Sequence, residues 1–299
     1  MMKKRTWLLL AAVGALVAGC HCDDEWAGKS RYITVDAGIE AQTRTTSVSV
    51  HSMTFEEGDR ISVYAWTGSP NEVNDTLVVG GTPNTLGSGA TWRPDTLMLW
   101  KDTTTPHYFL GIYPVREVTD FKADPYTLDS SDQEASDLLV ATNLAGLTAT
   151  DNPVSLSFNH VMAKLYVNLQ FRNQWETTPE VQALTVQASG TCTIDYLARS
   201  CTATGSQTTV ALPQTATELG YALSYAGIMV PQAGVTTVTV TIDGKDYTFT
   251  HTGDIPLEGN RYTTLNLVVG RDRIELGTVS INDWLTGETI DGGRAQHIE

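Results

Sequence analysis

Apolar and polar side chains alternate along most of this chain with a period of two residues, which is the pattern of a half-buried β-strand. The clearest example is TTVTVTIDGKDYTFT, residues 236–250. Its valines alternate with threonines, and Asp243-Gly244 supplies a two-residue turn. With this turn, Val240 lies opposite Tyr247 and Val238 opposite Phe249. We therefore predict a tight β-hairpin with one apolar face.

The same alternation recurs through the rest of the chain. No segment longer than about ten residues carries a convincing helical stripe. The best helix candidate is a short one within 131–141, capped by Ser130 or Ser131. The Gly- and Asn-rich stretch 71–92 is expected to form loops around one strand at 77–79. Further strands are predicted at 59–66, 107–115, 154–171, 181–190 and 261–270.

Short strands separated by Gly, Pro and Asn-Asp turns indicate β-sandwiches, since a parallel sheet would need crossover helices. The weakest stretch is 142–153, which is polar, rich in small residues and ends in Pro153. We place a domain boundary there, within a margin of fifteen residues. The sequence thus favours an all-β protein with two domains over one large domain.

The segment RYITVDAGIEAQTRTTSVSV, residues 31–50, contains an interrupted alternation. Ile33, Val35, Ala37 and Ile39 share one face of a predicted strand. A polar stop that contains Arg44 follows, and a second alternation then begins. The predicted strand is therefore followed by Arg44, which is flanked by threonines.

The amino terminus has the layout of a secretory signal peptide, with a basic start and an apolar run from Trp7 to Ala18 that is too short to span a bilayer. The run closes on LVAGC, which resembles a bacterial lipobox in which Cys20 is lipidated. The alternative is an ordinary signal peptide that happens to contain Cys20. The acidic stretch HCDDE that follows resembles the surface-export signal of Bacteroidota lipoproteins. Later apolar runs are all too short for a membrane helix, so any anchoring would come from lipid.

The charge of the mature chain is strongly negative. Residues 1–19 contain three basic and no acidic residues, so their removal takes the formal charge from −15 to −18. Such a surface repels nucleic acid and anionic membranes. Nucleic acid is therefore not an expected partner.

The sequence contains none of the HExxH, paired CxxC, GxxxxGK or GxSxG motifs of common enzymes and nucleotide-binding proteins. His160 lies inside a predicted strand, where a packed, hydrogen-bonded side chain is the expected role. We therefore predict neither an enzyme nor a bound cofactor.

Two groups of side chains are weak candidates for ligand binding. An acidic cluster between 129 and 137 has the ligand type for calcium but lacks the spacing of known loops, so a solvated face is the stronger interpretation. Four tryptophans are able to stack on sugar rings, but core packing explains them equally well. The acidic cluster is Asp129, Asp132, Glu134 and Asp137, and the tryptophans are Trp66, Trp92, Trp100 and Trp175.

Cysteine spacing suggests one crosslink. Cys192 and Cys201 flank TIDYLARS, a spacing that suits a disulfide across a hairpin in an oxidising envelope. Two buried free thiols are the alternative. Cys22 has no obvious partner within the chain.

Seven short landmarks occur in order along the chain: FEEGDRISVYAW (55–66), YFLGIYPV (108–115), DLLVA (137–141), LSFNHVMAKLYVNL (156–169), GIMVPQ (227–232), YTTLNLVV (262–269) and INDW (281–284). Each is weak alone, but together they cover about residues 44 to 285 behind a lipobox. The series resembles the fimbrillin (FimA/Mfa-like) family of Bacteroidota. This resemblance implies two transthyretin-like β-sandwich domains in tandem.

On this basis the chain divides into four parts. Residues 1–19 are the lipoprotein signal peptide, and 20–44 form a propeptide or tether with a removable first strand. Residues 45–152 form the N-terminal sandwich, and 153–299 form the C-terminal sandwich.

The family resemblance also implies removal of an N-terminal segment by an arginine-specific protease, followed by polymerisation through strand donation. Arg44 matches the cleavage position, and Arg31 is a weaker alternative. Before cleavage, Ile33, Val35 and Ile39 would fill a groove in the first domain. The alternative is that 31–43 is only a tether.

The donated strand is expected near 273–299. Its candidate aliphatic residues are separated by a glycine that resets the phase of the alternation. The tail that follows is more polar and less able to fill a groove. The candidates are Ile274, Leu276, Val279 and Ile281.

These features predict a structural or adhesive subunit of a fimbria on the outer membrane. Its expected partners are other fimbrial subunits, an arginine-specific protease and the outer membrane through lipid, with host or bacterial surface receptors as further candidates. The alternative function is a surface glycan-binding lipoprotein of a nutrient-uptake system.

Overall fold

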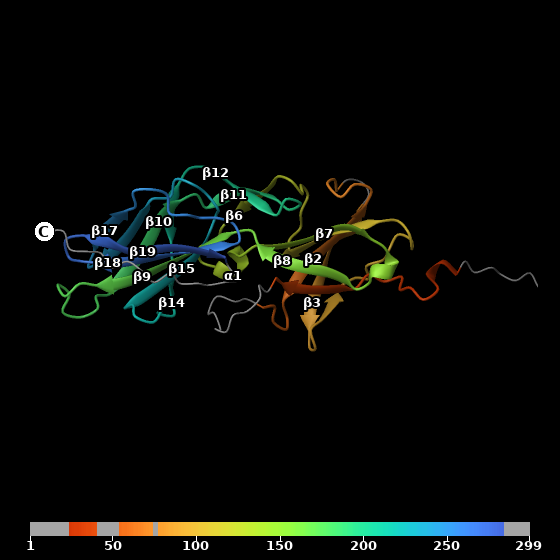
Figure 1. Cartoon of the computed structure of the whole chain (residues 1–299), viewed down its shortest axis with the longest axis horizontal. Coiled ribbons are helices and arrows are strands. Elements are labelled where there is room, and N and C mark those ends of the chain that lie inside the picture. The colour runs from red at the N-terminus through yellow and green to blue at the C-terminus, as the bar shows by residue number, and fades with distance from the viewer. Residues whose placement is uncertain (1–23, 41–53, 74–76, 284–299) are drawn as a thin grey trace, which may run out of the picture.

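Two β-sandwiches lie end to end along the long axis of the computed structural model (Figure 1). The structure describes residues 24–40, 54–73 and 77–283. The predicted fold class is confirmed: the chain is all-β, with two transthyretin-like sandwich domains in tandem. In the described part of the chain, we find no helix with the length and apolar character needed to span a bilayer.

The first domain is built on a seven-stranded sheet with the strand order β1-β8-β7-β5-β2-β3-β4. An apolar core covers each face of this sheet. Alternate residues of the central strands point to opposite faces, and each set is buried in a different cluster. Its strands are β1 (Val35–Ile39), β2 (Arg60–Thr67), β3 (Leu77–Gly87), β4 (Thr91–Pro94), β5 (His107–Tyr113), β7 (Leu139–Leu147) and β8 (Val154–His160).

A three-stranded sheet covers one face of the first domain and is shared between the two halves of the chain. Its order is β12-β11-β6, so a hairpin from the second half pairs with a strand from the first. The two halves are therefore joined by backbone hydrogen bonds as well as by packing. The strands are β6 (Asp124–Thr127), β11 (Thr191–Asp195) and β12 (Ser200–Thr204).

The second domain is a sandwich of a four-stranded and a five-stranded sheet around one core. The first sheet contains, in order, β13 (Thr208–Ala211), β10 (Val181–Ala188), β16 (Thr237–Ile242) and β17 (Lys245–Thr250). The second contains β14 (Gln214–Thr215), β15 (Leu223–Met229), β9 (Ala163–Phe171), β18 (Arg261–Val269) and β19 (Ile274–Asp283).

The predicted hairpin of β16 and β17 is confirmed with its register. Val238 pairs with Phe249 and Val240 with Tyr247. Asp243 and Gly244 both have positive φ angles, 50° and 71°. That geometry suits the two-residue turn whose twist matches the flanking strands.

The predicted single strand 154–171 is instead two strands that enter different sheets. The buried positions are even-numbered in β8 and odd-numbered through the core-facing residues of β9, and the change of phase occurs at Val161 and Met162, which are both buried. β8 therefore belongs to the first domain. The chain passes from the seven-stranded sheet to the five-stranded sheet between β8 and β9.

Two other local expectations are corrected. The short helix is α1 (Gln133–Ser136), and its cap is Asp132, whose side chain accepts a hydrogen bond from the Ala135 amide; neither Ser130 nor Ser131 caps it. The Gly- and Asn-rich stretch forms the long strand β3 and the short β4, because two register shifts against β2 absorb its irregular residues. The remaining helical turns are η1 (Asp24–Trp26) and η2 (Ala149–Asp151).

Candidate functional site

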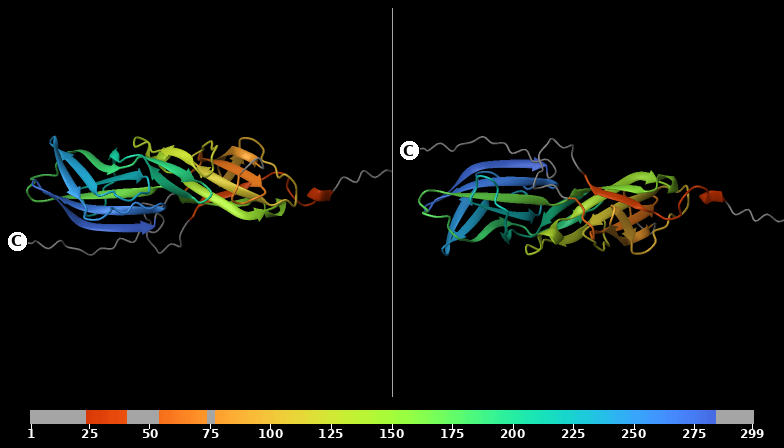
Figure 2. Two further views of the ribbon diagram at one scale, coloured as in Figure 1. Left: turned by 90° about the horizontal axis from the view of Figure 1, so that it is seen from above. Right: turned by 90° about the horizontal axis from the view of Figure 1, so that it is seen from below.

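The strand β1 lies along one side of the first domain (Figure 2). It runs parallel to β8, with pairs from Val35–Val154 to Ile39–Phe158. The ladder continues past its end, because the Glu40 amide donates to the Phe158 carbonyl (3.0 Å). A parallel pair at the amino end of a chain is held by long-range contacts alone, since no tight turn can join its two strands.

The opposite side of the same segment is also hydrogen-bonded. The Ile33 amide donates to the Met98 carbonyl (2.9 Å), and the Trp100 amide donates to the Arg31 carbonyl (3.1 Å). Residues 31–40 thus fill a gap between β8 and the segment 98–100 that follows β4. We call this gap the seam.

The inward side chains of the seam strand belong to the core of the first domain. Ile33 is 1% exposed and Val35 is 6% exposed, while Ala37 and Ile39 are partly buried against the same cluster. The alternate residues Tyr32, Thr34 and Asp36 are exposed. Of the three residues predicted to fill a groove, Ile33 and Val35 lie within the core and Ile39 lies at its margin.

Two side chains outside the segment 31–40 bond directly to its main chain. The Trp92 indole Nε1 donates to the Ala37 carbonyl (3.0 Å). The Asn152 side-chain Oδ1 accepts from the Thr34 amide (2.9 Å). Trp92 is on β4 and is 4% exposed, so its N–H has been taken out of water for this contact.

The loop behind the second edge of the seam is held by polar contacts. His107 is fully buried: its Nε2 accepts from the Lys101 amide (3.1 Å) and its Nδ1 donates to the Thr105 carbonyl (2.7 Å). Burial lowers the pKa of the His107 imidazole. Hydrogen bonds from the hydroxyl and amide of Thr105 lower the pKa of Asp102 in the same loop. The loop also anchors the start of the described chain, because Thr103 donates to Glu25 through its hydroxyl (3.0 Å).

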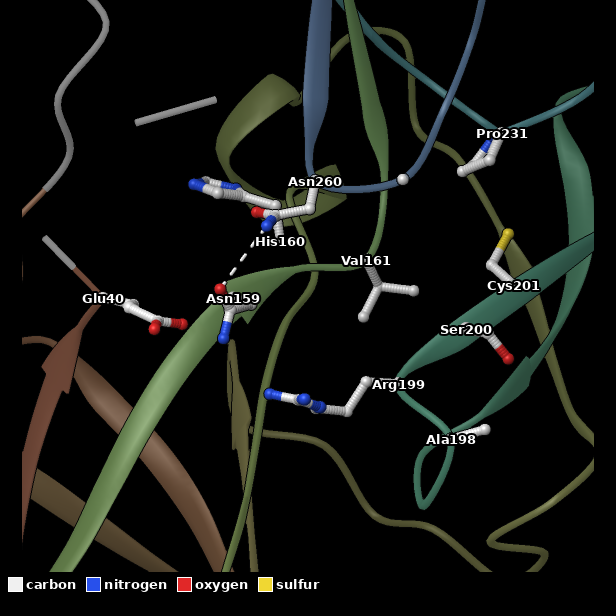
Figure 3. A pocket seen from close by; sticks show the side chains of 11 residues that line it. Glu40, Asn159, His160, Val161, Ala198, Arg199, Ser200, Cys201, Pro231 and Asn260 are labelled. Carbon is white, nitrogen blue, oxygen red and sulfur yellow. Dashed lines mark hydrogen bonds between the residues drawn. The ribbon is translucent and has the colours of Figure 1, made fainter. Parts of the chain in front are cut away.

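Beyond Ile39 the seam leads to a pocket of about 410 Å³ at the junction of the two domains (Figure 3). Its lining includes Glu40, Asn159, Val161, Arg199 and Asn260. The Asn260 Nδ2 donates to the Asn159 Oδ1 (3.4 Å), and the Arg199 side chain extends towards Asn159. Amide and guanidinium groups therefore line the pocket next to Glu40.

The four predicted donor residues lie on β19, at the edge of the five-stranded sheet. β19 pairs antiparallel with β18. Leu276 and Val279 pack against the core while partly exposed, Ile274 is 9% exposed, and Ile281 is partly buried.

Gly277 is an extra residue in this ladder. Leu276 pairs with Leu267 but Thr278 pairs with Asn266, so the β-bulge lies at Gly277. The bulge keeps Leu276 and Val279 on the same face of β19, although they are three residues apart. A Cβ at position 277 would lie 3.1 Å from the Asn266 carbonyl oxygen, which explains why glycine suits the bulge.

The side chains of the acidic cluster form hydrogen bonds with other groups of the protein. Asp129 accepts from Ser131, Asp132 caps α1, and Glu134 accepts from the Tyr113 hydroxyl. Asp137 is buried and bonds to His160 Nδ1 (2.7 Å), which places His160 as a packed, hydrogen-bonded residue. Among the described residues, no group of three or more His, Cys, Asp or Glu side chains is arranged to hold a metal ion.

The tryptophans considered for sugar stacking are mostly internal. Trp66, Trp92 and Trp100 are between 0 and 4% exposed. Trp175 is partly buried between aromatic neighbours, with Arg271 over its ring. The motivation for glycan binding by exposed tryptophans is thereby removed at three of the four positions.

The two cysteines of the β11–β12 hairpin are both thiols, Cys192 buried and Cys201 partly buried; a disulfide between them stays a prediction. Cys192 pairs with Ala203, and Cys201 pairs with Ile194. The cysteines are therefore diagonal neighbours on two paired strands. The Cys201 side chain and burial together raise the pKa of the Cys192 thiol.

Two predicted processing positions, Cys20 and Arg44, lie outside the described residues. The contacts that sequence reasoning missed are those of Trp92, Asn152 and the segment 98–100. Each joins parts of the chain that are more than 50 residues apart. Periodicity describes one segment at a time, so no signal in the sequence indicated that the seam has a second edge.

Comparison with known proteins agrees with this architecture. A family model described as Fimbrillin-like matches residues 43–284, which is more than half of the chain. No curated protein matches the sequence.

Solved structures of Bacteroides proteins have the same fold. A protein assigned to cell adhesion from Bacteroides uniformis is 16% identical, with a TM-score of 0.64, over 85% of this chain and 98% of that one. A similar protein from Bacteroides ovatus is 16% identical, with a TM-score of 0.66, over 86% and 99%. A fimbrial protein from Bacteroides vulgatus is 14% identical, with a TM-score of 0.53, over 85% and 100%. At these identities the likeness concerns the fold.

Proposed function

Because this chain belongs to the fimbrillin-like family, we propose that it is a structural or adhesive subunit of a cell-surface fimbria that assembles by strand donation. It would reach the surface as a lipoprotein anchored at Cys20. An arginine-specific protease would then cut after Arg44 and free the seam strand from the rest of the chain. The partner would be another fimbrial subunit.

The observation that carries this proposal is the position of β1. It is the first of the described strands and an edge strand of its sheet, yet its side chains complete the core. Residues 41–53 connect it to the remainder of the first domain, and Arg44 is four residues beyond Glu40. A single cut there would leave the strand held only by non-covalent contacts.

Those contacts explain why the strand would leave only by exchange. Burying one aliphatic side chain contributes about 1.5–3 kcal/mol, so Ile33 and Val35 together contribute several kcal/mol. An empty seam would expose this apolar surface and two rows of unpaired backbone groups. A strand from a neighbouring subunit would satisfy both needs at once.

We propose β19 as the donor, because it is an edge strand near the carboxyl end with four aliphatic side chains. Its donation would first require separation from β18, with which it pairs along its whole length. Strand exchange would therefore be slow, and the docked β1 segment would protect the subunit until assembly begins.

Digestion with an arginine-specific protease tests the cleavage step. Wild-type protein should yield a stable product that begins at Thr45, and an Arg44→Lys variant should not, although trypsin should cut both. Arg31→Lys is the matched control and should still yield the Thr45 product. Failure to obtain that product from wild type, or its appearance from Arg44→Lys, contradicts the assignment of Arg44.

A surface glycan-binding role has no specific observation in its favour. Its motivation was the predicted surface location together with the number of aromatic side chains, and three of the four tryptophans considered for sugar stacking lie in cores. A screen against host and plant polysaccharides remains its test.

A further inference from the structure

We infer that Trp92 and Asn152 form hydrogen bonds with the main chain of whichever strand occupies the seam. These bonds determine which face of that strand turns inward and in which direction the strand runs. This inference rests on the proposed strand donation. It adds two positioning residues to the acceptor, and it describes the partner as an extended strand parallel to β8.

The main-chain groups of residues 31–40 point alternately to the two edges of the seam. Groups of the even residues face β8: the Glu40 amide donates to the Phe158 carbonyl, and the Thr34 carbonyl accepts from the Val154 amide (2.8 Å). Groups of the odd residues face the other edge, where Arg31 and Ile33 bond to the segment 98–100. The inward side chains are also on odd residues, so the face and the hydrogen-bonding side are coupled.

The segment 98–100 bonds to Arg31 and Ile33, and Trp92 supplies a hydrogen bond further along the same side of the seam. Its indole N–H donates to the Ala37 carbonyl (3.0 Å), in the position where a neighbouring strand would donate a backbone N–H. A strand displaced by one residue would turn its Ala37-equivalent carbonyl towards β8 and leave the buried indole N–H without an acceptor. A buried donor that loses its partner is costly, so the displaced strand is disfavoured.

Asn152 supplies the directional contact. Its Oδ1 accepts from the Thr34 amide, and two residues later the Val154 amide donates to the Thr34 carbonyl. A reversed strand would place a carbonyl against the Asn152 oxygen and an N–H against the Val154 amide. Both contacts would be mismatched, so the seam accepts a strand with the polarity of β1.

Because the hydrogen bonds of Trp92 and Asn152 to the segment 31–40 go to main-chain atoms, they can form with a strand of any sequence. Aliphatic side chains at alternate positions supply affinity, and these two residues supply orientation. A donor strand from a second copy of the chain would therefore need aliphatic side chains at the positions of Ile33 and Val35. The residues between and around them could differ.

Hydrogen exchange on the intact protein tests the role of Trp92 without any cleavage. Trp92→Phe retains an aromatic ring but removes the N–H donor, and it should raise the exchange rate of amides in residues 33–40 by about 3- to 10-fold. Trp66→Phe is the matched control, because the Trp66 indole is buried in the same sheet but donates to the Ser69 carbonyl. Equal exchange of residues 33–40 in the two variants would overturn the role of Trp92.

A reversed-sequence peptide tests polarity. Protein cut at Arg44 is mixed with a labelled peptide of residues 31–44 or with its reversed sequence, and the reversed peptide should bind at least about tenfold more weakly. Asn152→Ala should narrow this difference, and Asn152→Asp, which keeps an acceptor oxygen, should retain it. Equal binding of both peptides to wild type would overturn the role of Asn152.

The two experiments separate this inference from the proposed function. If the cut segment never exchanges with the forward peptide, strand donation at this seam is wrong, and the peptide experiment counts against both ideas. Hydrogen exchange on uncut protein still decides whether Trp92 holds the strand, because it does not depend on cleavage.

Discussion

The strands β1 and β19 are both edge strands near the ends of the chain, but the protein uses them differently. β1 is short, and the segment 31–40 that contains it is bonded on two sides and has Ile33 and Val35 almost fully buried. β19 is twice as long and pairs with β18, while most of its aliphatic side chains remain partly exposed. β1 completes a core, and β19 covers the border of one.

This difference indicates which strand leaves a usable site behind it. Removal of β1 would open a core and two rows of backbone groups, so the first domain would need a replacement strand. Loss of β19 would expose β18 but only the margin of the second core. The acceptor is therefore expected in the first domain and the donor in the second.

The largest expected effect comes from matched Ile→Ala substitutions in the two strands. Ile33→Ala should lower the free energy of unfolding by about 2–4 kcal/mol, because it creates a cavity in the core. Ile281→Ala removes the same atoms from a partly exposed position and should cost about 1 kcal/mol or less. Urea denaturation of both variants measures the difference, and equal losses would contradict the distinction between the strands.

The second prediction compares the strands as ligands for the seam after cleavage at Arg44. A peptide of residues 31–44 should bind about tenfold more tightly than one of residues 273–283, because the extra Gly277 interrupts the alternation that the straight seam requires. Deleting Gly277 from the second peptide places its four aliphatic residues two apart and should recover much of the difference. Unchanged affinity after the deletion would show that the bulge does not limit donation.

Much of the fold follows from alternation that is local in the sequence. The β16–β17 hairpin was predicted with its pairing because Asp-Gly and the flanking valines lie within fifteen residues. The side of β1 that turns inward was predictable for the same reason.

Other features depend on contacts between distant segments. Residues 154–171 alternate on both sides of the junction between β8 and β9. The crossing is marked only by the change from even-numbered to odd-numbered apolar positions. The pairing of β11 with β6 and the bond from Trp92 to Ala37 join residues whose separation gives no periodic signal. The cap of α1 was missed because Ser and Asp are equally good caps, and the choice lies in the surrounding turn.

The third prediction concerns acid. Since burial lowers the pKa of His107, the folded state binds a proton less readily than the unfolded state below about pH 6.5. Its contribution to stability is complete above that pH and is lost as the pH falls through the folded-state pKa. Asp102 and Lys101 are the charged neighbours; Asp102 favours the proton and Lys101 opposes it.

Protonation would break the bond that His107 accepts from Lys101, next to the edge formed by Trp100. The protection factors of the amides in residues 31–34, which correct for the intrinsic pH dependence of exchange, should therefore fall between pH 7.5 and pH 5, while those of β19 should change less. His107→Gln should flatten this dependence, and His251→Gln, in the second domain, should not. A pH profile that is unchanged in His107→Gln would assign the effect to another group.

The smallest expected effect is on the polar contacts of β19. Glu275 accepts a hydrogen bond from Arg172 and forms an ion pair with Arg273 (2.8 Å), and all three side chains are at least 30% exposed. Exposed ion pairs contribute little, so Glu275→Gln should cost less than about 1 kcal/mol and less still in 1 M salt. A larger or salt-independent loss in thermal denaturation would show that β19 is held more firmly than its burial indicates.

The central claim is that the strand at residues 31–40 is exchanged for a strand of another subunit. The most direct measurement is the mass-spectrometric content of assembled material, formed from full-length protein cut after Arg44 and separated from monomer by size. The account predicts that monomers retain the fragment ending in Arg44 and that assemblies lack it. Assemblies that retain one fragment per subunit, or that form equally well from uncut Arg44→Lys protein, would contradict it.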